Sequence, residues 1–465
     1  MLPLLAAGAL WIIPLTTLLV SDRFGAHDYS RVVEVMMLTG CAVVWAWGRR
    51  GRPVAPGMAG WMAWALAVCV LLSAAMAHHP WIAAREVTVA AGLIVFALAI
   101  RDALSEQRLR MLLTVLAATA FGYGLVVYVP LVLAVSAGAT IYTYDLVVGF
   151  DNPRFLNHCQ SVAIPLLILA ATWRPVRPLQ RWVALIAATM ACGILGFCNA
   201  RASVLATLAA TLVPLIILGR RAFRFSFTLL LVLAIGGIGM TYVAWDWPRT
   251  LDEFTSIEAL TQLNFRNYLI RHALQLWWSA PWLGVGPMHF ADSPNSVAAH
   301  PHNAYLQILC EYGVFAAGLV LALLCRAGWS LLRVTRAIRL EGGSDSAQNE
   351  LAAAMVGTMA AVLVDALFSG SFVMPLSQLW CAMAIGMAAW FHRAKSGISP
   401  GVAASGLARS SAARWVVCLA LLLLSLQSLQ ELMSLPVPAL LTAEQPSVPR
   451  GLASRNPRFW EHGWF

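Results

Sequence analysis

Long apolar runs separated by short polar connections make up most of the chain. Runs of about 20 residues, enough to cross a hydrocarbon core of roughly 30 Å, occur thirteen times. These expected spans are residues 3–20, 31–48, 58–77, 82–100, 111–136, 161–173, 182–199, 203–219, 225–244, 304–325, 351–370, 375–392 and 415–434. The pattern predicts an all-α polytopic membrane protein with about 12–13 transmembrane helices, forming one integral membrane domain over residues 1–465.

The composition supports this fold class. Of the 465 residues, 60% are hydrophobic and only 11% are charged, so lipid must solvate most of the surface. The first run lacks a basic n-region and a small-residue cleavage site, so we expect a membrane helix there rather than a signal peptide. None of the nine cysteines forms a C-x-x-C pair, so they are expected to be small buried hydrophobic residues.

The net charge of +10 matters less than where the basic residues lie. In a soluble protein it would suggest nucleic acid, but here we expect membrane lipids as neighbours and no nucleic acid. With a cytoplasmic N-terminus, 20 of the 31 basic residues fall in inside loops, as the positive-inside rule requires. The other 11 lie outside: Arg23, Arg31, Arg85, Arg154, Arg201, Arg249, Arg266, Arg271, Arg450, Arg455 and Arg458.

Two outside connections, about 137–160 and 245–303, are long enough to carry a site, and 435–465 is expected to form an outside tail. The loop 245–303 is expected to contain amphipathic helical structure along the outer membrane face. A helix is predicted there by the helical spacing of Phe265, Leu269, His272 and Leu276. The sequence Ser279-Ala280-Pro281 is expected to end it. Trp277 and Trp278 suit the membrane interface.

The segment "HPHNAYLQILCEYG" combines two histidines with a helix start. A helical pattern begins at about Ala304, which puts Asn303 at the N-cap position, where its side chain can accept a backbone N–H. His302 is then held just outside the first turn, and an imidazole with an ordinary pKa near 6.5 can accept a proton at neutral pH. The alternative is that His300 and His302 are interfacial polar residues without chemistry. Of the two, His300, before Pro301, keeps only that interfacial interpretation.

Four arginines are candidates for anion binding. Arg201, in "FCNARASVLATLAA", lies between two apolar runs, where a guanidinium needs either a partner such as a phosphate or a route to the interface. Arg266 and Arg271 are five residues apart and so do not share a helical face. Arg154 follows the turn sequence Asp151-Asn152-Pro153 and is expected either to face a site or to pair with Asp151.

Several enzyme motifs are missing from the sequence. It has no D-x-D, H-E-x-x-H or Walker motif, and the outside acids are not spaced as a metal cage or a glycosidase pair. We therefore expect a metal-independent site with no metal ligands and no cofactor.

Three segments together resemble the O-antigen ligase and O-antigen polymerase superfamily, and the ligases in particular: "NARASVLATLAA", "NFRNYLIRHALQLWWSAPWLGVGPMHF" and "HNAYLQILCEYGVFAAGL". The resemblance covers roughly residues 151–319, includes the H-N-x-Y-L signature, and extends to "GFDNPRFLNHCQS". The chain departs from the family in having "NARAS" where many members have S-R-G, and in a thirteenth expected span where about twelve are usual.

This resemblance implies a GT-C-like glycosyltransferase fold and a specific reaction. An O-antigen glycan would pass from undecaprenyl diphosphate to a sugar hydroxyl of lipid A–core, with inversion, at the periplasmic side of the bacterial inner membrane. His302 would be the catalytic base, Arg201, Arg266, Arg154 and Arg271 would bind the diphosphate, and Asn303 and Tyr305 would position the site.

Three other functions stay open from the sequence. A polymerase would use a second lipid-linked glycan as acceptor, and an oligosaccharide ligase acting on protein would differ only in its acceptor. A transporter or flippase of lipid-linked sugars belongs to a different class and would place charge at the midplane in paired, broken helices. The sequence shows no such repeat and concentrates its unexplained charge on one face.

Overall fold

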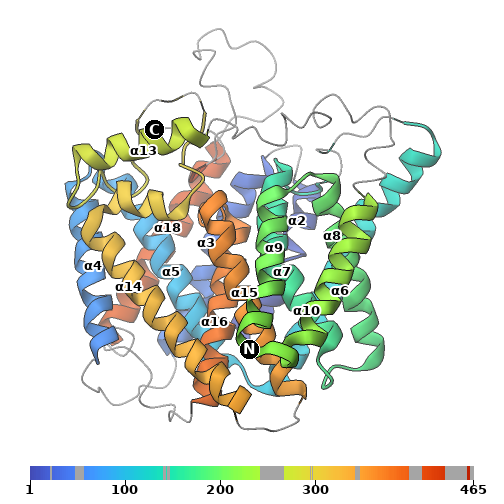
Figure 1. The fold of residues 1–465 in the computed structure, drawn as a ribbon. Helices are drawn as coiled ribbons and strands as arrows, with labels where there is room; N and C mark the ends of the chain where they lie inside the picture. Colours follow the sequence, from blue (N-terminus) through green and yellow to red (C-terminus); the bar gives the residue numbers. More distant parts are fainter. Residues whose placement is uncertain are drawn as a thin grey trace.

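A computed structural model describes residues 1–20, 24–47, 57–139, 143, 147–240, 266–293, 295, 297–340, 346–396, 411–434 and 458–460. Within these residues the regular structure is entirely helical (Figure 1). The long helices are α3 (Ala26–Trp47), α4 (Met58–Met76), α5 (Pro80–Ala103), α6 (Glu106–Ser136), α7 (Pro153–Thr172), α8 (Pro178–Phe197), α9 (Arg201–Leu218), α14 (Ala304–Leu340), α15 (Ser346–Phe368), α16 (Pro375–Lys395) and α18 (Ser411–Ser434). The shorter ones are α1 (Leu2–Gly8), α2 (Ile13–Thr16), η1 (Thr17–Leu19), η3 (Gly219–Ala222), α10 (Phe223–Val232), η4 (Leu233–Ile238) and α13 (Arg266–Ser279).

These helices make the chain a multi-pass membrane protein, as the hydropathy pattern predicts. Among the described residues, ten helices are long and apolar enough to cross a membrane, or eleven if the bent pair Leu2–Gly8 and Ile13–Leu19 forms one span. The sequence predicts about 12–13 spans, which is more than this count, for two reasons. The expected spans 203–219 and 225–244 both overlap a single helical stretch, Arg201–Ile238, and the expected span 375–392 corresponds to α16, which is not among the ten.

The stretch Arg201–Ile238 is a hairpin rather than one straight helix. At Gly219 the backbone adopts φ +60°, a conformation that glycine reaches without steric cost, and the chain turns through η3 into α10. Figure 1 shows α9 and α10 running alongside each other from this turn, and the two helices are in contact. Two neighbouring apolar segments therefore read as one helix by length and hydropathy alone.

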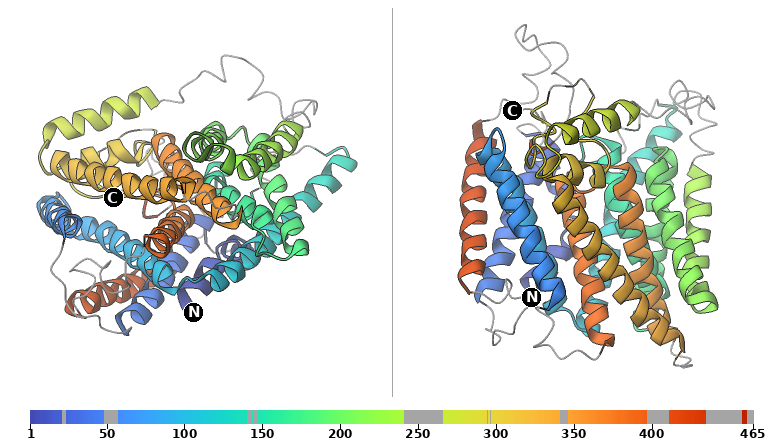
Figure 2. Two further views of the ribbon diagram at one scale, coloured as in Figure 1. Left: turned by 60° about the horizontal axis from the view of Figure 1, so that its bottom comes forward. Right: turned by 60° about the vertical axis from the view of Figure 1, so that its left-hand side comes forward.

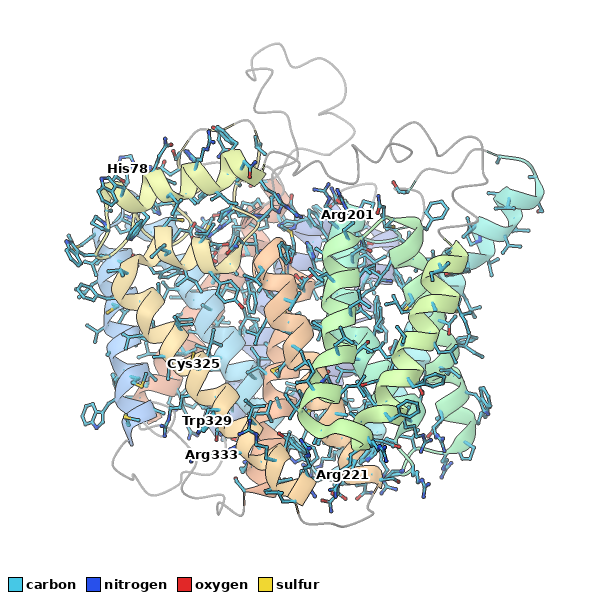
Figure 3. All side chains as sticks on the ribbon, in the orientation of Figure 1. His78, Arg201, Arg221, Cys325, Trp329 and Arg333 are labelled. Atoms are coloured by element: carbon cyan, nitrogen blue, oxygen red, sulfur yellow. The ribbon has the colours of Figure 1, made fainter. Side chains whose placement is uncertain are left out.

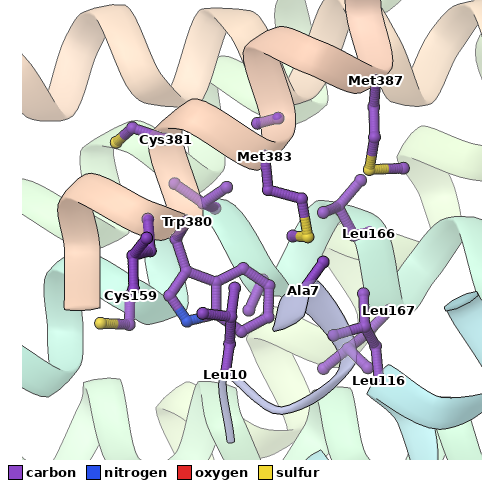
Figure 4. Packing of buried hydrophobic residues seen from close by; sticks show 14 of the residues in the cluster. Ala7, Leu10, Leu116, Cys159, Leu166, Leu167, Trp380, Cys381, Met383 and Met387 are labelled. Atoms are coloured by element: carbon purple, nitrogen blue, oxygen red, sulfur yellow. The ribbon is translucent and has the colours of Figure 1, made fainter. Parts of the chain in front are cut away.

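The core of the bundle lies around α7 and α16. Nearly every α7 residue is buried, and Figure 2 shows α15 and α16 surrounded by the other helices when the bundle is seen from below. Trp380, Met383 and Met387 of α16 point toward α1 and α7 (Figure 4), and the Trp380 and Trp11 rings lie 5.4 Å apart. Inside a membrane such packing stabilises helix association mainly through van der Waals contact, because lipid is as apolar as the core.

One face of the bundle carries α13, and we call it the α13 face. The helix lies across the ends of the long helices (Figure 1) and ends at Ser279, as the sequence pattern predicts. The loop after it pairs with a break in α14: the N–H groups of Val285 and Gly286 donate to Cys310 O and Glu311 O, and Val314 N–H donates to Pro281 O, each at 2.9 Å. Gly313, at φ +76°, allows this break.

All nine cysteines are free, as the lack of paired motifs predicts. Most are buried, and Cys325 is exposed on α14. Of the expected long loop 245–303, residues 245–265 lie outside the described residues, and so do 435–457 and 461–465 of the expected tail.

Candidate active site

The candidate site residues lie at or just before the beginnings of helices. Arg154 is the second residue of α7, Arg201 is the first residue of α9, and Arg266 is the first described residue of α13. His302 precedes α14 by two residues. Figure 3 shows Arg201 on the α13 face. The free N–H groups and positive dipole at helix N-termini favour anions, so this arrangement adds to the charge of the side chains.

The end of α15 holds three of the predicted residues together. Tyr305 donates its hydroxyl proton to Leu363 O at 3.1 Å, and Asn303 Nδ2 donates to Leu367 O at 3.0 Å. Arg266 Nη2 donates to Phe368 O at 3.0 Å. The last four carbonyl groups of a helix, here including those of Leu367 and Phe368, have no partner within the helix and so are available to side chains. One helix end therefore connects the beginnings of α13 and α14.

Asn303 is the N-cap of α14, as the sequence predicts. Its Oδ1 accepts the backbone N–H of Leu306 at 2.9 Å, while Nδ2 makes the bond to α15. The amide thus satisfies one orphan donor of α14 and joins that helix to its neighbour. Both bonds fix the direction in which the chain enters α14, directly after His302.

His302 has an unusual backbone conformation, held by His300. Its φ is +51°, in the left-handed region that few non-glycine residues adopt. Its backbone N–H donates to His300 Nδ1 at 3.2 Å, and the two rings lie 4.2 Å apart. The expectation that His300 is merely an interfacial residue is wrong, because its side chain is buried and supports His302. Local backbone strain of this kind is often found at functional sites.

The surroundings of His302 keep its imidazole neutral. Burial is the largest cause of a pKa lowered from 6.5 to about 3, and the nearby basic groups Arg154, His158 and Arg266 lower it further. A neutral imidazole has a nitrogen lone pair that can accept a proton. An anion bound among the same arginines opposes their charge and so raises the His302 pKa toward its ordinary range.

The arginines also affect one another. Burial lowers the pKa of Arg266, and the nearby charges of Arg154 and Arg201 lower it in the same direction. Three guanidinium groups that repel one another are stabilised when an anion enters between them. The structure therefore brings Arg154, Arg201, Arg266 and His302 into one cationic site on the α13 face.

Arg271 is placed differently from these three. It is exposed on α13, five residues beyond Arg266, and it is not among the charges that shift the pKa of Arg266 or His302. Asp151, the alternative partner of Arg154, accepts the backbone N–H groups of Ala26 and His27 at the start of α3.

A buried carboxylate beneath the site was missed by the sequence reasoning. Asp365 of α15 is 1% exposed, and its Oδ2 accepts the Ser369 hydroxyl at 2.6 Å. The hydroxyl groups of Ser161 and Ser203 lie 3.1 and 3.4 Å from Oδ1, and His158 Nδ1 lies 3.4 Å from Oδ2. This network joins α7, α9 and α15 directly below Arg154 and Arg201.

Two sequence signals pointed to this network. Asp365 is an acidic residue in an expected membrane span, and such residues usually have a partner and a function. His158 lies four residues after Arg154, so the two share a face if that segment is helical.

A second buried network, also unforeseen, holds the residues we call the C-terminal anchor, Arg458 to Trp460. Arg458 Nη2 donates to Glu311 Oε2 at 2.7 Å, and the Arg458 and Phe459 carbonyls accept from Arg31 at 3.0 and 3.2 Å. Arg31 is itself paired with Glu34 at 2.5 Å. The anchor is buried against α3 and α14 rather than lying at the surface.

Fold and site together define a polytopic, all-helical membrane protein with a cationic site and a neutral imidazole at one face of the bundle. Comparison with protein families matches residues 185–321 to the O-antigen ligase family. The match covers less than a third of the chain and places an O-antigen ligase-like segment on the part that contains the cationic site. The matched segment includes Arg201, Arg266 and His302, whereas Arg154, His158 and Asp365 lie outside it. No curated protein matched the chain.

Proposed function

We propose that the protein is an O-antigen ligase, a metal-independent inverting glycosyltransferase of lipopolysaccharide biosynthesis. It would move O-antigen polysaccharide from undecaprenyl diphosphate to a sugar hydroxyl of lipid A–core. The observation that carries the proposal is the set of three arginines, in which Arg154 and Arg266 lie near the neutral imidazole of His302 and Arg201 lies near Arg266. The match of residues 185–321 to the O-antigen ligase family supports a lipid-linked glycan as the substrate.

In the proposed reaction, a hydroxyl oxygen of the acceptor sugar attacks the anomeric carbon of the donor glycan. His302 accepts the proton of that hydroxyl as the new C–O bond forms. The bond between the anomeric carbon and the diphosphate oxygen breaks, and the electron pair leaves with the diphosphate. Arg201 and Arg266 stabilise the charge that develops on the leaving group, with Arg154 beside them. A single displacement inverts the anomeric configuration.

In this scheme, binding of the donor raises the pKa of His302 and so makes it a stronger base. Before the donor binds, the arginines and burial keep the pKa of His302 low, which makes it a weak base. The diphosphate brings negative charge next to the same arginines and raises that pKa toward neutrality, where proton transfer is most efficient. The active base therefore forms only when a donor is in place. Asn303 and Tyr305 position the imidazole through α15.

We place the site on the periplasmic side of the bacterial inner membrane. Arg221, in the turn between α9 and α10, and Arg333, in the second half of α14, lie at the end of the bundle opposite Arg201 (Figure 3). Basic loops stay in the cytoplasm according to the positive-inside rule, so the α13 face would be periplasmic. The loop 245–303 and the tail 435–465 would lie on that side.

The test is transfer in proteoliposomes that contain lipid-linked O-antigen and purified lipid A–core, with EDTA present. Transfer should persist with EDTA, and it should be lost in His302→Ala while donor binding remains. Arg201→Ala and Arg266→Ala should weaken donor binding, and Arg271→Ala should weaken it less. Arg336→Ala, at the opposite end of α14, is the control and should retain activity. Full activity of His302→Ala would contradict the mechanism.

The same assay separates the ligase from its nearest alternative. A polymerase extends the glycan on a second carrier lipid, so a ladder of longer carrier-linked products forms without lipid A–core. A ligase leaves the donor unchanged under that condition. Movement of donor across the bilayer without any new glycosidic bond would instead identify a transporter or flippase.

A further inference from the structure

A cluster of metal-ligand side chains lies on the α13 face, away from the arginines. His78 and His79 come from the three-residue connection between α4 and α5, and Asp292 comes from the loop between α13 and α14. One ligand atom of each residue lies within 4.8 Å of the others. Figure 3 shows His78 and Arg201 well apart on this face. The cluster is thus separate from the proposed transfer site.

The ligand atoms of these three residues are spaced almost as they would be around a bound transition-metal ion. His78 Nδ1 lies 3.1 Å from Asp292 Oδ2, and His79 Nε2 lies 3.8 Å from Asp292 Oδ1. Two ligands of tetrahedral zinc, each about 2.0–2.1 Å from the ion, are themselves roughly 3.3 Å apart. Small rotations of these partly exposed side chains therefore suffice to complete a three-ligand site, with the fourth position open to water.

Another histidine holds the ligand loop in place. His289 is buried, and its Nε2 accepts the backbone N–H of His79 at 2.8 Å. Its Nδ1 lies 2.8 Å from Pro287 O, which gives a neutral ring that donates from Nδ1 and accepts at Nε2. Such supporting hydrogen bonds are typical of metal sites, where they fix the orientation of the ligands.

We propose that His78, His79 and Asp292 form a structural site for a borderline transition-metal ion such as Zn²⁺. Two imidazoles and one carboxylate suit zinc, whereas Mg²⁺ and Ca²⁺ prefer oxygen ligands alone. The ion would tie the α4–α5 connection to the loop that leads toward His302. It would stabilise the α13 face without taking part in transfer, which is consistent with a metal-independent reaction.

The test is a titration of the detergent-solubilised full chain, without a polyhistidine tag, after EDTA treatment and desalting. Titration with ZnCl₂ should show one saturable site per chain, and MgCl₂ should show none. His78→Ala and Asp292→Asn should each weaken Zn²⁺ binding at least tenfold. His272→Ala, which removes a histidine from α13 outside the cluster, is the matched control and should bind as the parent does.

X-ray absorption at the zinc edge identifies the ligands independently of affinity. The proposal requires nitrogen and oxygen ligands at about 2.0–2.2 Å and no sulfur. Sulfur ligands would show that cysteines bind the ion and would overturn it. Absence of saturable Zn²⁺ binding, or equal affinity in His78→Ala, Asp292→Asn and the parent, would overturn it as well.

Discussion

The guanidinium of Arg458 lies 2.7 Å from the carboxylate of Glu311, and both side chains are closed to solvent. They belong to segments 147 positions apart, and the pair joins the C-terminal anchor to the first half of α14. Glu311 also accepts the backbone N–H of Phe290 at 3.2 Å. One ion pair thus holds together the anchor, α14 and the loop that leads to His302.

We expect Arg458→Met to destabilise the protein strongly. Removing one partner of a buried ion pair leaves the other charge uncompensated, at a cost of about 3–5 kcal/mol. The double variant Arg458→Met with Glu311→Gln should be more stable than Arg458→Met alone, because it leaves no lone buried charge. Thermal unfolding in detergent measures both effects. Arg336→Met, an exposed arginine of the same chain, is the control, and an equal loss in that variant would contradict the prediction.

The pH dependence of transfer should report the low pKa of His302. As the pH falls, kcat/KM decreases when the base of the free enzyme becomes protonated, and we call this decrease the acid limb. It should lie below pH 6.5, because burial and the nearby arginines lower the His302 pKa to about 3. The acid limb of kcat follows the donor complex and should lie at higher pH, since the diphosphate raises that pKa. Initial rates from about pH 2.5 to about pH 8 separate the two limbs.

Arg154→Gln should shift the acid limb of the kcat/KM profile to higher pH. The substitution removes one of the positive charges that lower the His302 pKa, so that pKa rises and the acid limb moves to higher pH. The overall rate should also fall, because a diphosphate contact is lost. Arg271→Gln should leave the limb where it is. A limb that moves to lower pH in Arg154→Gln would contradict the proposed electrostatics.

The hydrophobic pattern predicted the helices well because period and length alone specify membrane spans. The start of α14 was also predictable, since an N-cap such as Asn303 acts within its own turn. What the pattern missed depends on contacts between distant segments. The role of Asp365 depends on serines of α7, α9 and the α15–α16 connection, and the burial of Arg458 depends on Glu311. The support that His300 gives His302 depends on a positive φ that no periodicity signals.

The Asp365 network should affect catalysis more than donor binding. Asp365→Asn keeps the size of the side chain but removes the charge that faces His158 and replaces an acceptor with a donor toward the serines. Buried networks lose much of their stability when one member is unsatisfied. We expect kcat to fall at least tenfold with a smaller change in KM. Ser369→Ala removes the hydroxyl that donates to Asp365 and accepts the Ser371 N–H, but it removes no charge, so it should have a milder effect on kcat.

Asn303 is expected to have two separable roles. Asn303→Ala removes both the cap and the bond to Leu367 O, and loss of a cap costs about 0.5–2 kcal/mol. Asn303→Ser keeps a capping oxygen but loses the donor to α15. Thermal unfolding should therefore show Asn303→Ser closer to the parent than Asn303→Ala. Transfer activity should fall in both variants, because both lose the connection that positions His302.

Gly313 should tolerate no side chain. The residue has φ +76°, which is costly for any residue with a Cβ, and a Cβ built there would lie 2.2 Å from Trp282 O. The same break in α14 receives the N–H groups of Val285 and Gly286, so a shift at Gly313 would also displace the loop that leads to His302. We expect Gly313→Ala to lower both the unfolding temperature and transfer. Gly318→Ala, five residues further along α14 with no atom within 4 Å of a built Cβ, is the matched control, and comparable losses in the two variants would contradict this prediction.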